Sequence, residues 1–341
     1  MTDLPAAFTS EEDLEDFMTL PSSDLVADLN KVDGDILILG VAGKMGVTLA
    51  RMAKRAVPHK RVIGVARFTD PDAARKLEQA GVETVKCDLA DRNQVEGLDD
   101  CANVIFMAGR KFGSAGNLPL TWAMNAHVPS IVAERFKTSR IVAFSTACVY
   151  AMTEVGAGGS VEGDPLTPPG EYANSCIGRE RMFEYFSARH GTPGKLVRLS
   201  YAIDMRYGVL HDVASAVLDN RPVPLEMSHV NVIWQGDANA CALRLLTRTT
   251  TPTSPINISG PEIVSIRELA QVFGKLLGCT PKFSGAPAPN VWLVDTSEQQ
   301  RIFGPPAVPL STLAEWTADW VTSGRASLGK PTHFEVSDGT Y

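Results

Sequence analysis

The sequence has no apolar run that approaches the roughly 20 residues a membrane-spanning helix requires, so it does not predict a membrane protein. Its six cysteines are scattered, without a Cys-x-x-Cys pair or a histidine cluster at ligand spacing. We therefore expect reduced thiols in a cytoplasmic protein and no structural metal. The sequence also lacks a basic stripe, which argues against a nucleic-acid partner. The N-terminus has neither a basic stretch nor a long apolar core, so we expect no signal peptide.

What is present is an ordinary globular composition with one acidic segment. The 341 residues are 44% hydrophobic and 21% charged, enough for about two domains. The net charge of −7 is concentrated in residues 1–35, which hold ten acidic residues and one lysine. Ser10 begins a capping-box pattern followed by acids, and residues 10–31 predict two short helices. We expect residues 1–34 to be an acidic helical extension that packs on the main domain or on a partner subunit.

From residue 35 onward, short apolar runs alternate with amphipathic stretches. A continuous run such as Ile36–Leu39 is expected of a strand that is buried on both faces. The predicted strands are Ile36–Leu39, Arg61–Ala66, Glu83–Val85, Val104–Met107, Ile141–Phe144 and Leu196–Leu199, and the clearest predicted helices are 45–56, 120–136, 172–189 and Arg267–Leu277. This alternation predicts an α/β fold with a Rossmann-type doubly wound parallel sheet and a smaller C-terminal substrate domain.

The regular alternation fades after about residue 200, where prolines punctuate the chain. We expect an NAD(P)-binding domain over residues 35–205, with a return segment at about 230–262. Residues 206–229 and 263–341 would form the smaller substrate-binding region, with a pocket between the two parts.

The first predicted strand runs into a glycine-rich turn and then into a helix. The turn reads Gly40-Val-Ala-Gly43-Lys44-Met45-Gly46, a G-x-x-G-x-x-G pattern in strand–turn–helix context. Glycines permit a tight turn and a close approach of the backbone to a pyrophosphate, which lies at the helix N-terminus. We therefore predict that Gly40, Gly43, Lys44, Met45 and Gly46 bind a dinucleotide cofactor.

The end of the second predicted strand bears on which dinucleotide is bound. NAD-specific folds place Asp or Glu about 20 residues after the glycines, on the ribose 2′-hydroxyl. Here Ala66 holds that place and Arg67 follows it, and an arginine can bind a 2′-phosphate. This favours NADP over NAD, and the other interpretation is a surface arginine with no ligand. Asp88 and Leu89, after the third strand, are placed to contact adenine.

Several further motifs extend this pattern along the chain. They are Asp88-Leu89, Met107-Ala108-Gly109, Asn125, Ser145-Thr146-Ala147-Cys148-Val149-Tyr150, Tyr172 in Glu-Tyr-Ala-Asn-Ser-Cys, and Ile256-Asn-Ile-Ser-Gly-Pro followed by Ile266-Arg-Glu-Leu. Over about residues 35–280 the chain resembles the extended short-chain dehydrogenase/reductase family, in its NAD-dependent epimerase/dehydratase group.

The resemblance implies roles for individual residues. In that family a Ser or Thr, a Tyr and a Lys four residues after the Tyr perform the chemistry. By position, Thr146 would orient the substrate oxygen and Tyr172 would transfer the proton while also contacting the cofactor. Asn125 would support the proton relay through its backbone or a water, and Ala108 and Gly109 would contact the cofactor.

The sequence departs from the family at Cys176, which stands where the lysine should be. An unperturbed tyrosine has a pKa near 10, so only about a thousandth of it is phenolate at pH 7, and a thiol does not supply the cation that favours phenolate. Three interpretations stay open. Another cation substitutes, either Lys111, on a loop that also borders the cofactor, or Arg179, on the helical face of Tyr172. Otherwise a different acid/base acts, or the site is inactive and only binds cofactor.

The later part of the sequence bears on the substrate. Nucleotide-sugar enzymes of this family usually carry an arginine seven residues before an aspartate, and it clamps the diphosphate. Here Val230 takes that place before Asp237, which weakens the nucleotide-sugar interpretation. We expect a smaller polar, sugar-like substrate, with Arg206 and Trp234 as candidate contacts.

The leading hypothesis is an NAD(P)-dependent oxidoreductase or epimerase that acts on a hydroxyl or carbonyl of a small polar substrate and prefers NADP. The alternatives are a catalytically silent NADP(H)-binding sensor or regulatory protein, and a nucleotide-sugar epimerase or dehydratase. By analogy with the family, helices 120–136 and 172–189 would form the interface of a homodimer.

Overall fold

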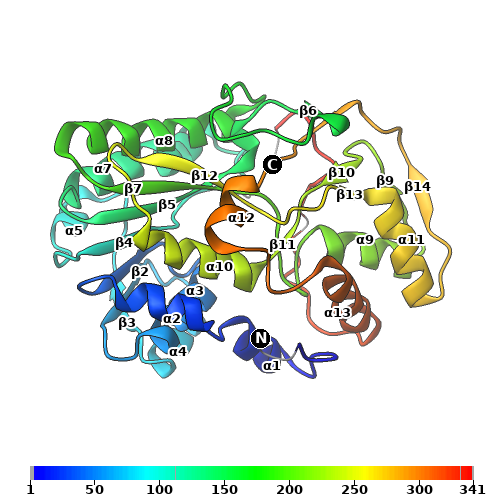
Figure 1. The fold of residues 1–341 in the computed structure, drawn as a ribbon, viewed down its shortest axis with the longest axis horizontal. Coiled ribbons are helices and arrows are strands. Elements are labelled where there is room, and N and C mark those ends of the chain that lie inside the picture. The colour runs from blue at the N-terminus through cyan, green and yellow to red at the C-terminus, as the bar shows by residue number, and fades with distance from the viewer. Residues whose placement is uncertain (1–3, 112, 331, 340–341) are drawn as a thin grey trace.

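Seven strands form one parallel sheet, which confirms the doubly wound α/β fold expected from the sequence (Figure 1). The computed structural model describes residues 4–111, 113–330 and 332–339. In spatial order the strands are β12 (Ser254–Ile258), β7 (Gly194–Leu199), β5 (Arg140–Thr146), β4 (Asn103–Phe106), β1 (Ile36–Leu39), β2 (Val62–Ala66) and β3 (Glu83–Lys86). The strand order reverses between β1 and β4, and ligands of such folds bind outside the carboxyl ends of the strands at this point.

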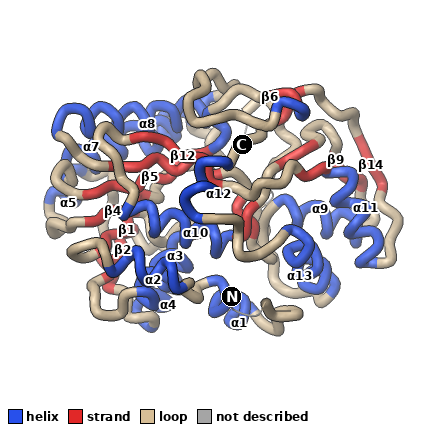
Figure 2. Tube along the Cα trace, in the orientation of Figure 1, coloured by secondary structure: helices blue, strands red, loops and turns tan. Residues whose placement is uncertain are grey.

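Both faces of the sheet are buried under helices, as the layers in Figure 2 show. In β1, Ile36 and Ile38 belong to one core, whereas Leu37 and Leu39 belong to the other. The sheet face with Ile36 and Ile38 is covered by α2 (Ser23–Asn30), α3 (Gly46–Ala56), α4 (Pro71–Gln79) and α10 (Gln235–Arg244). The face with Leu37 and Leu39 is covered by α5 (Arg92–Glu96), α7 (Val128–Arg135) and α8 (Glu171–His190). Burial on both faces explains why β1 reads as an uninterrupted apolar run.

A separate hydrophobic core, called the second core below, lies beside the sheet, on the right in Figures 1 and 2. It is built mainly by α9 (Val209–Leu218), α11 (Ile266–Leu277) and α13 (Leu310–Thr322). Short strand pairs surround it: β8 (Ala202–Ile203) with β11 (Ile233–Trp234), β9 (Pro222–Pro224) with β14 (Lys282–Ser284), β10 (His229–Val230) with β13 (Val264–Ser265), and β6 (Thr153–Glu154) with β15 (Asn290–Val291). Helix α12 (Ser297–Phe303) packs against β12 and the core on the sheet face of Ile36 and Ile38. No helix in the described ranges is long and apolar enough to cross a membrane.

The helical stretch predicted over 120–136 is confirmed, and it contains a π-helical turn that matters for the site. The segment is α6 (Leu118–Trp122), a π-helical turn (Ala123–His127) and then α7. Pro129 has no N–H, so it cannot donate to the carbonyl four residues earlier, which is that of Asn125. Such local widening of a helix is frequent at functional sites.

The acidic N-terminal segment forms the two predicted helices, α1 (Glu11–Met18) and α2. The Ser10 hydroxyl accepts the Asp13 N–H at 3.1 Å, so α1 begins at a side-chain cap. Its apolar side packs into the second core, where Phe17 lies edge-on to Trp316 with ring centroids 5.6 Å apart. Helix α1 therefore anchors the N-terminal segment to the second core.

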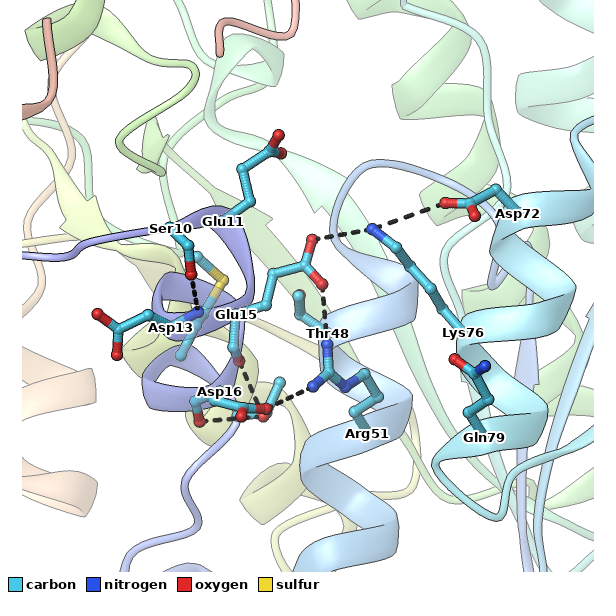
Figure 3. A network of polar contacts seen from close by, with 12 residues as sticks. Ser10, Glu11, Asp13, Glu15, Asp16, Thr48, Arg51, Asp72, Lys76 and Gln79 are labelled. Atoms are coloured by element: carbon cyan, nitrogen blue, oxygen red, sulfur yellow. Dashed lines mark hydrogen bonds and ion pairs between the residues drawn. The ribbon is translucent and has the colours of Figure 1, made fainter. Parts of the chain in front are cut away.

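Glu15 of α1 pairs with cations both from helices that cover the sheet and from the segment after β8. Its carboxylate lies 2.8 Å from Arg51 of α3 and 3.4 Å from Lys76 of α4 (Figure 3). The same carboxylate accepts from Arg206, after β8, at 2.9 Å. Burial alone would raise the pKa of Glu15, but the hydrogen bond and charge of Arg206, with Lys76 and Arg51, hold it below its usual 4.5.

We expect Glu15→Gln to lower the free energy of unfolding by about 1–3 kcal/mol near neutral pH, because three cations lose a buried charged partner. A lowered folded-state pKa stabilises the protein above 4.5 and loses that effect as pH falls through the folded value, so the deficit should shrink in acid. Urea unfolding at several pH values measures this difference in the free energy of unfolding between variant and wild type. Glu12→Gln, on the exposed side of the same helix, is the control; equal losses for both variants would contradict the bridging role.

Candidate active site

The glycine loop connects the end of β1 to α3 at the switch point of the sheet. Gly40 has φ +87°, and a Cβ there would lie 2.6 Å from the backbone nitrogen of Ala108, so only glycine fits. A Cβ on Gly46 would collide with the carbonyl of Val41. Met45, at the N-cap of α3, makes no side-chain cap, and the first turn holds no acid. The uncapped N–H groups fit the diphosphate of a dinucleotide.

The loop after β4 runs beside the glycine loop and meets α8. Gly109 is exposed, and a Cβ there would collide with the guanidinium of Arg179. Arg179 is buried; it donates from Nη1 to the Phe144 carbonyl and from Nη2 to Asn125 Oδ1, both at 2.8 Å. Arg179 is therefore a fixed positive charge beneath this loop.

Asn125, in the π-helical turn, ties α8 to the same loop. Its Oδ1 accepts the Arg110 N–H at 2.8 Å, and its Nδ2 donates to the Arg110 carbonyl at 3.0 Å. Nδ2 also donates to Ser175 Oγ at 2.9 Å, and Ser175 in turn donates to the Tyr172 carbonyl at 2.6 Å. The amide of Asn125 is thus a positioning group for the loop and for the first turn of α8.

Tyr172 lies in the first turn of α8, with Cys176 one turn further along the helix. Both side chains are buried in one small cluster with Ala147 and Val149, which directly follow Thr146. Burial, then the neighbouring thiols Cys176 and Cys148, raises the pKa of Tyr172 well above 10, and Arg179 opposes this in part. Burial likewise raises the pKa of Cys176. The phenol is therefore protonated at neutral pH in this structure.

Thr146 ends β5, next to this cluster. Its Oγ1 accepts the Cys148 N–H at 3.2 Å, which leaves the hydroxyl proton to donate elsewhere. The preceding Ser145 donates to Glu180 of α8 at 2.5 Å, and Glu180 pairs with Arg198 of β7 at 2.7 Å with both side chains almost fully buried. The hydroxyl of Thr146 is therefore held by a rigid junction of β5, β7 and α8.

Lys111 follows Gly109 and Arg110 on the loop after β4. Burial lowers its pKa, and the charges of Cys148, Cys176 and Asp212 act in the opposite sense. Those partners include the thiol of Cys176, one helical turn after Tyr172, so the charge of Lys111 acts on that part of the cluster.

The predicted adenosine contacts lie at the ends of β2 and β3. Arg67 is exposed directly after β2 and forms no hydrogen bond or ion pair with any residue the structure describes. Asp88 shapes a turn by accepting the Ala90 N–H at 3.0 Å, and Leu89 is buried beside it. Arg67 is thus available to a ligand, whereas Leu89 packs mainly into the core.

The structure places Arg206 and Trp234 differently from the sequence-based expectation of substrate contacts. Arg206 is buried and donates to both oxygens of Asp204 and, from Nη1, to Glu11 and Glu15 at 2.9 Å. Trp234 is buried in the aromatic cluster of the second core, 5.7 Å from Trp316. Both contact the N-terminal segment, so we do not include them in the proposed substrate site.

Several supporting residues escaped the sequence analysis. Arg198 and Glu180 are the buried pair described above, and Tyr150 links them to β12 by accepting from Arg198 at 2.8 Å and donating to Asn257 at 2.7 Å. Pro129 was a usable signal, because a proline four residues after Asn125 predicts an interrupted helix at that residue. In the described part of the chain, no group of three or more His, Cys, Asp or Glu side chains could hold a metal.

These features define an enzyme of the extended short-chain dehydrogenase/reductase type, with a Rossmann fold and a glycine loop at the switch point of its sheet. The sequence pattern of the NAD dependent epimerase/dehydratase family matches residues 36–209, and the chain belongs to that family. No curated protein matches the chain.

Solved structures with the same fold cover most of this chain and almost all of their own. UDP-glucuronic acid 4-epimerase from Bacillus cereus, in complex with NAD, has a TM-score of 0.70 and 18% identity over 85% of this chain and 99% of its own. UDP-glucose 4-epimerase from Thermus thermophilus, also with NAD, gives 0.68 and 19% over 84% and 98%. dTDP-glucose 4,6-dehydratase from Bacillus anthracis gives 0.73 and 15% over 85% and 97%. At these identities the likeness concerns the fold.

Proposed function

We propose that the chain is an NAD(P)-dependent oxidoreductase or epimerase that acts on a hydroxyl or carbonyl of a small polar, sugar-like substrate. The observation that carries this proposal is the placement of Tyr172. It lies buried at the start of α8, clustered with the residues that follow Thr146, with Arg179 acting on it electrostatically. A phenol, a hydroxyl donor and a cation are the groups that proton transfer at a carbinol requires.

When bound, the nicotinamide would accept or supply a hydride at the carbon that bears the reacting oxygen. During reduction Tyr172 would deliver its phenolic proton to that oxygen. During oxidation its phenolate would take the proton of the substrate hydroxyl. The raised pKa keeps the phenol in its protonated, proton-donating form at neutral pH, so oxidation requires a cation that favours the phenolate. Thr146 would donate its hydroxyl proton to the same oxygen and so hold it in place.

We assign the missing cation to Lys111 together with Arg179. Arg179 lowers the pKa of Tyr172 through its charge, and its terminal nitrogens already bond to Asn125 and Phe144. It therefore acts as a fixed charge that touches no ligand. Lys111, on a loop, is the cation that could reach the cofactor ribose in place of the lysine that Cys176 replaces.

The cofactor would be held by Gly40, Gly43, Lys44, Met45 and Gly46, and by Ala108, Gly109 and Lys111 on the neighbouring loop. Asp88 and Leu89 would border the adenine. We propose NADP as the preferred form, because exposed Arg67 at the end of β2 can pair with a 2′-phosphate. The solved structures named above contain NAD, so this preference is a property proposed for this chain alone.

A nucleotide-sugar epimerase or dehydratase is the second candidate. It is supported by the substrates in the names of the structures with the same fold, which include UDP-glucose and dTDP-glucose. Against it, Val230 holds the place of the diphosphate-binding arginine and is fully buried in β10. We therefore favour a smaller substrate.

We also propose that the chain forms a homodimer through α6 and α8. Leu118, Leu120 and Trp122 of α6 are each about two-fifths exposed, and Tyr185 of α8 is half exposed. Leu120, Trp122 and Tyr185 lie in the segments 120–136 and 172–189, for which the family resemblance predicts an interface, and Leu118 lies just before them. Exposed apolar side chains of this kind favour burial against a second copy.

We expect Tyr172→Phe to reduce turnover by about a hundredfold to ten-thousandfold, because it removes the proton that the acid/base transfers. The dissociation constant for NADPH should stay nearly the same, since the cofactor's other contacts remain. Nicotinamide absorbance with a panel of sugars, sugar acids and polyols measures turnover, and fluorescence titration measures binding. Tyr185→Phe, at the exposed end of the same helix, is the control. Undiminished turnover by the Tyr172→Phe protein would refute the assignment.

Arg67→Ala should weaken NADPH binding by about ten- to a hundredfold and leave NADH binding nearly unchanged, since only NADPH carries the 2′-phosphate. Calorimetric titration with NADPH and with NADH measures the two dissociation constants for each protein. Arg61→Ala is the matched control, because Arg61 lies at the opposite end of β2 and pairs with Glu83 at 2.8 Å. A wild-type protein that binds NADH more tightly than NADPH would overturn the preference.

A further inference from the structure

Lys44 of the glycine loop has a side chain that points away from the rest of that loop. Its Nζ lies 3.3 Å from the carbonyl of Ala202 and 3.5 Å from the ring centroid of Tyr207. Both partners follow β7, in the part of the chain that leads into the second core. The ammonium therefore reaches from the glycine loop to the segment that follows β7.

No carboxylate among the described residues neutralises Lys44 as an ion pair. The acid whose charge acts on it most strongly is Asp204. Both oxygens of Asp204 already accept hydrogen bonds from Arg206, at 2.8 to 3.0 Å. The other strong charges on Lys44 are positive and come from Lys111, Arg206 and Lys330.

A buried Lys44 ammonium with positive charges acting on it is energetically unfavourable without an anion. Burial, together with Lys111, Arg206 and Lys330, lowers the pKa of Lys44 to about 7, although Asp204 opposes this. A desolvated ammonium among like charges gains stability when an anionic group binds beside it. The aromatic face of Tyr207 offers a weaker partner that such a group can supplement.

We propose that Lys44 binds a carboxylate of the substrate, so that the substrate is a small sugar-like acid and not a neutral sugar or polyol. This inference rests on the proposed function, because it concerns the same site. The cofactor's diphosphate is the other anion within reach of this loop. The uncapped N-terminus of α3 already serves that diphosphate, whereas the Nζ of Lys44 faces Ala202 and Tyr207.

The test compares matched acids and polyols as ligands of the NADPH-saturated protein. Gluconate and glycerate are the acid probes, and sorbitol and glycerol are their neutral counterparts. We expect at least one acid to raise the melting temperature and to bind about tenfold or more tightly than its polyol. Lys44→Met should abolish the difference, and Lys44→Arg should retain part of it. The Tyr172→Phe protein should keep the preference for the acid over its polyol, so the result is independent of turnover.

Lys54→Met is the control variant, because the ammonium of Lys54, like that of Lys44, hydrogen-bonds to backbone carbonyls, here those of Pro58 and Lys60. It should leave acid binding unchanged. The proposal would be overturned if the polyols bind to the wild-type protein as tightly as the acids, or if it binds none of the acids. Both results are measured on the wild-type protein, so they do not depend on whether a variant folds. A Lys44→Met protein that loses NADPH affinity and keeps acid binding would assign the lysine to the cofactor's phosphates instead.

Discussion

The site depends on a buried ion pair that fixes α8 against the sheet. Glu180 and Arg198 lie 2.7 Å apart and are almost completely shielded from water. Removal of either partner would leave a buried charge unpaired, which is strongly destabilising. Ser145 joins the pair from the end of β5, so the strand that carries Thr146 and the helix that carries Tyr172 are held in one register. The amide of Asn125 fixes the first turn of α8 from the opposite side.

On this scaffold the residue one helical turn after the phenol is a cysteine, where the family resemblance predicts a lysine. A thiol at Cys176 leaves Tyr172 without an ammonium one turn away, and burial raises its pKa. We propose that positive charge is supplied instead from other elements, by Arg179 beneath the loop and by Lys111 on it. The glycine loop carries a further ammonium, that of Lys44, which we propose binds a carboxylate of the substrate.

The sequence predicted the sheet well because buried parallel strands are continuous apolar runs, and β1 matches its predicted bounds residue for residue. It also placed the glycine loop, where local backbone geometry dictates the residue type. It did not predict partners far apart in the chain, such as Arg206 with Glu15, because no local pattern links an acid in α1 to a residue after β8. Nor did it predict the direction of Lys44, which depends on where Tyr207 packs. The division into an extension, a cofactor domain and a substrate region stays a prediction.

The most direct test of the account is the titration of the Tyr172 phenol by NMR, with tyrosine labelled at the ring carbon that bears oxygen. The Tyr172→Phe protein assigns the signal, and the wild-type protein is compared with Cys176→Lys. We predict that Tyr172 of the cofactor-free wild-type protein stays protonated beyond pH 10, the usual tyrosine value. In Cys176→Lys it should ionise at lower pH, because the new ammonium favours the phenolate. A wild-type phenol that ionises well below its usual value would contradict the account.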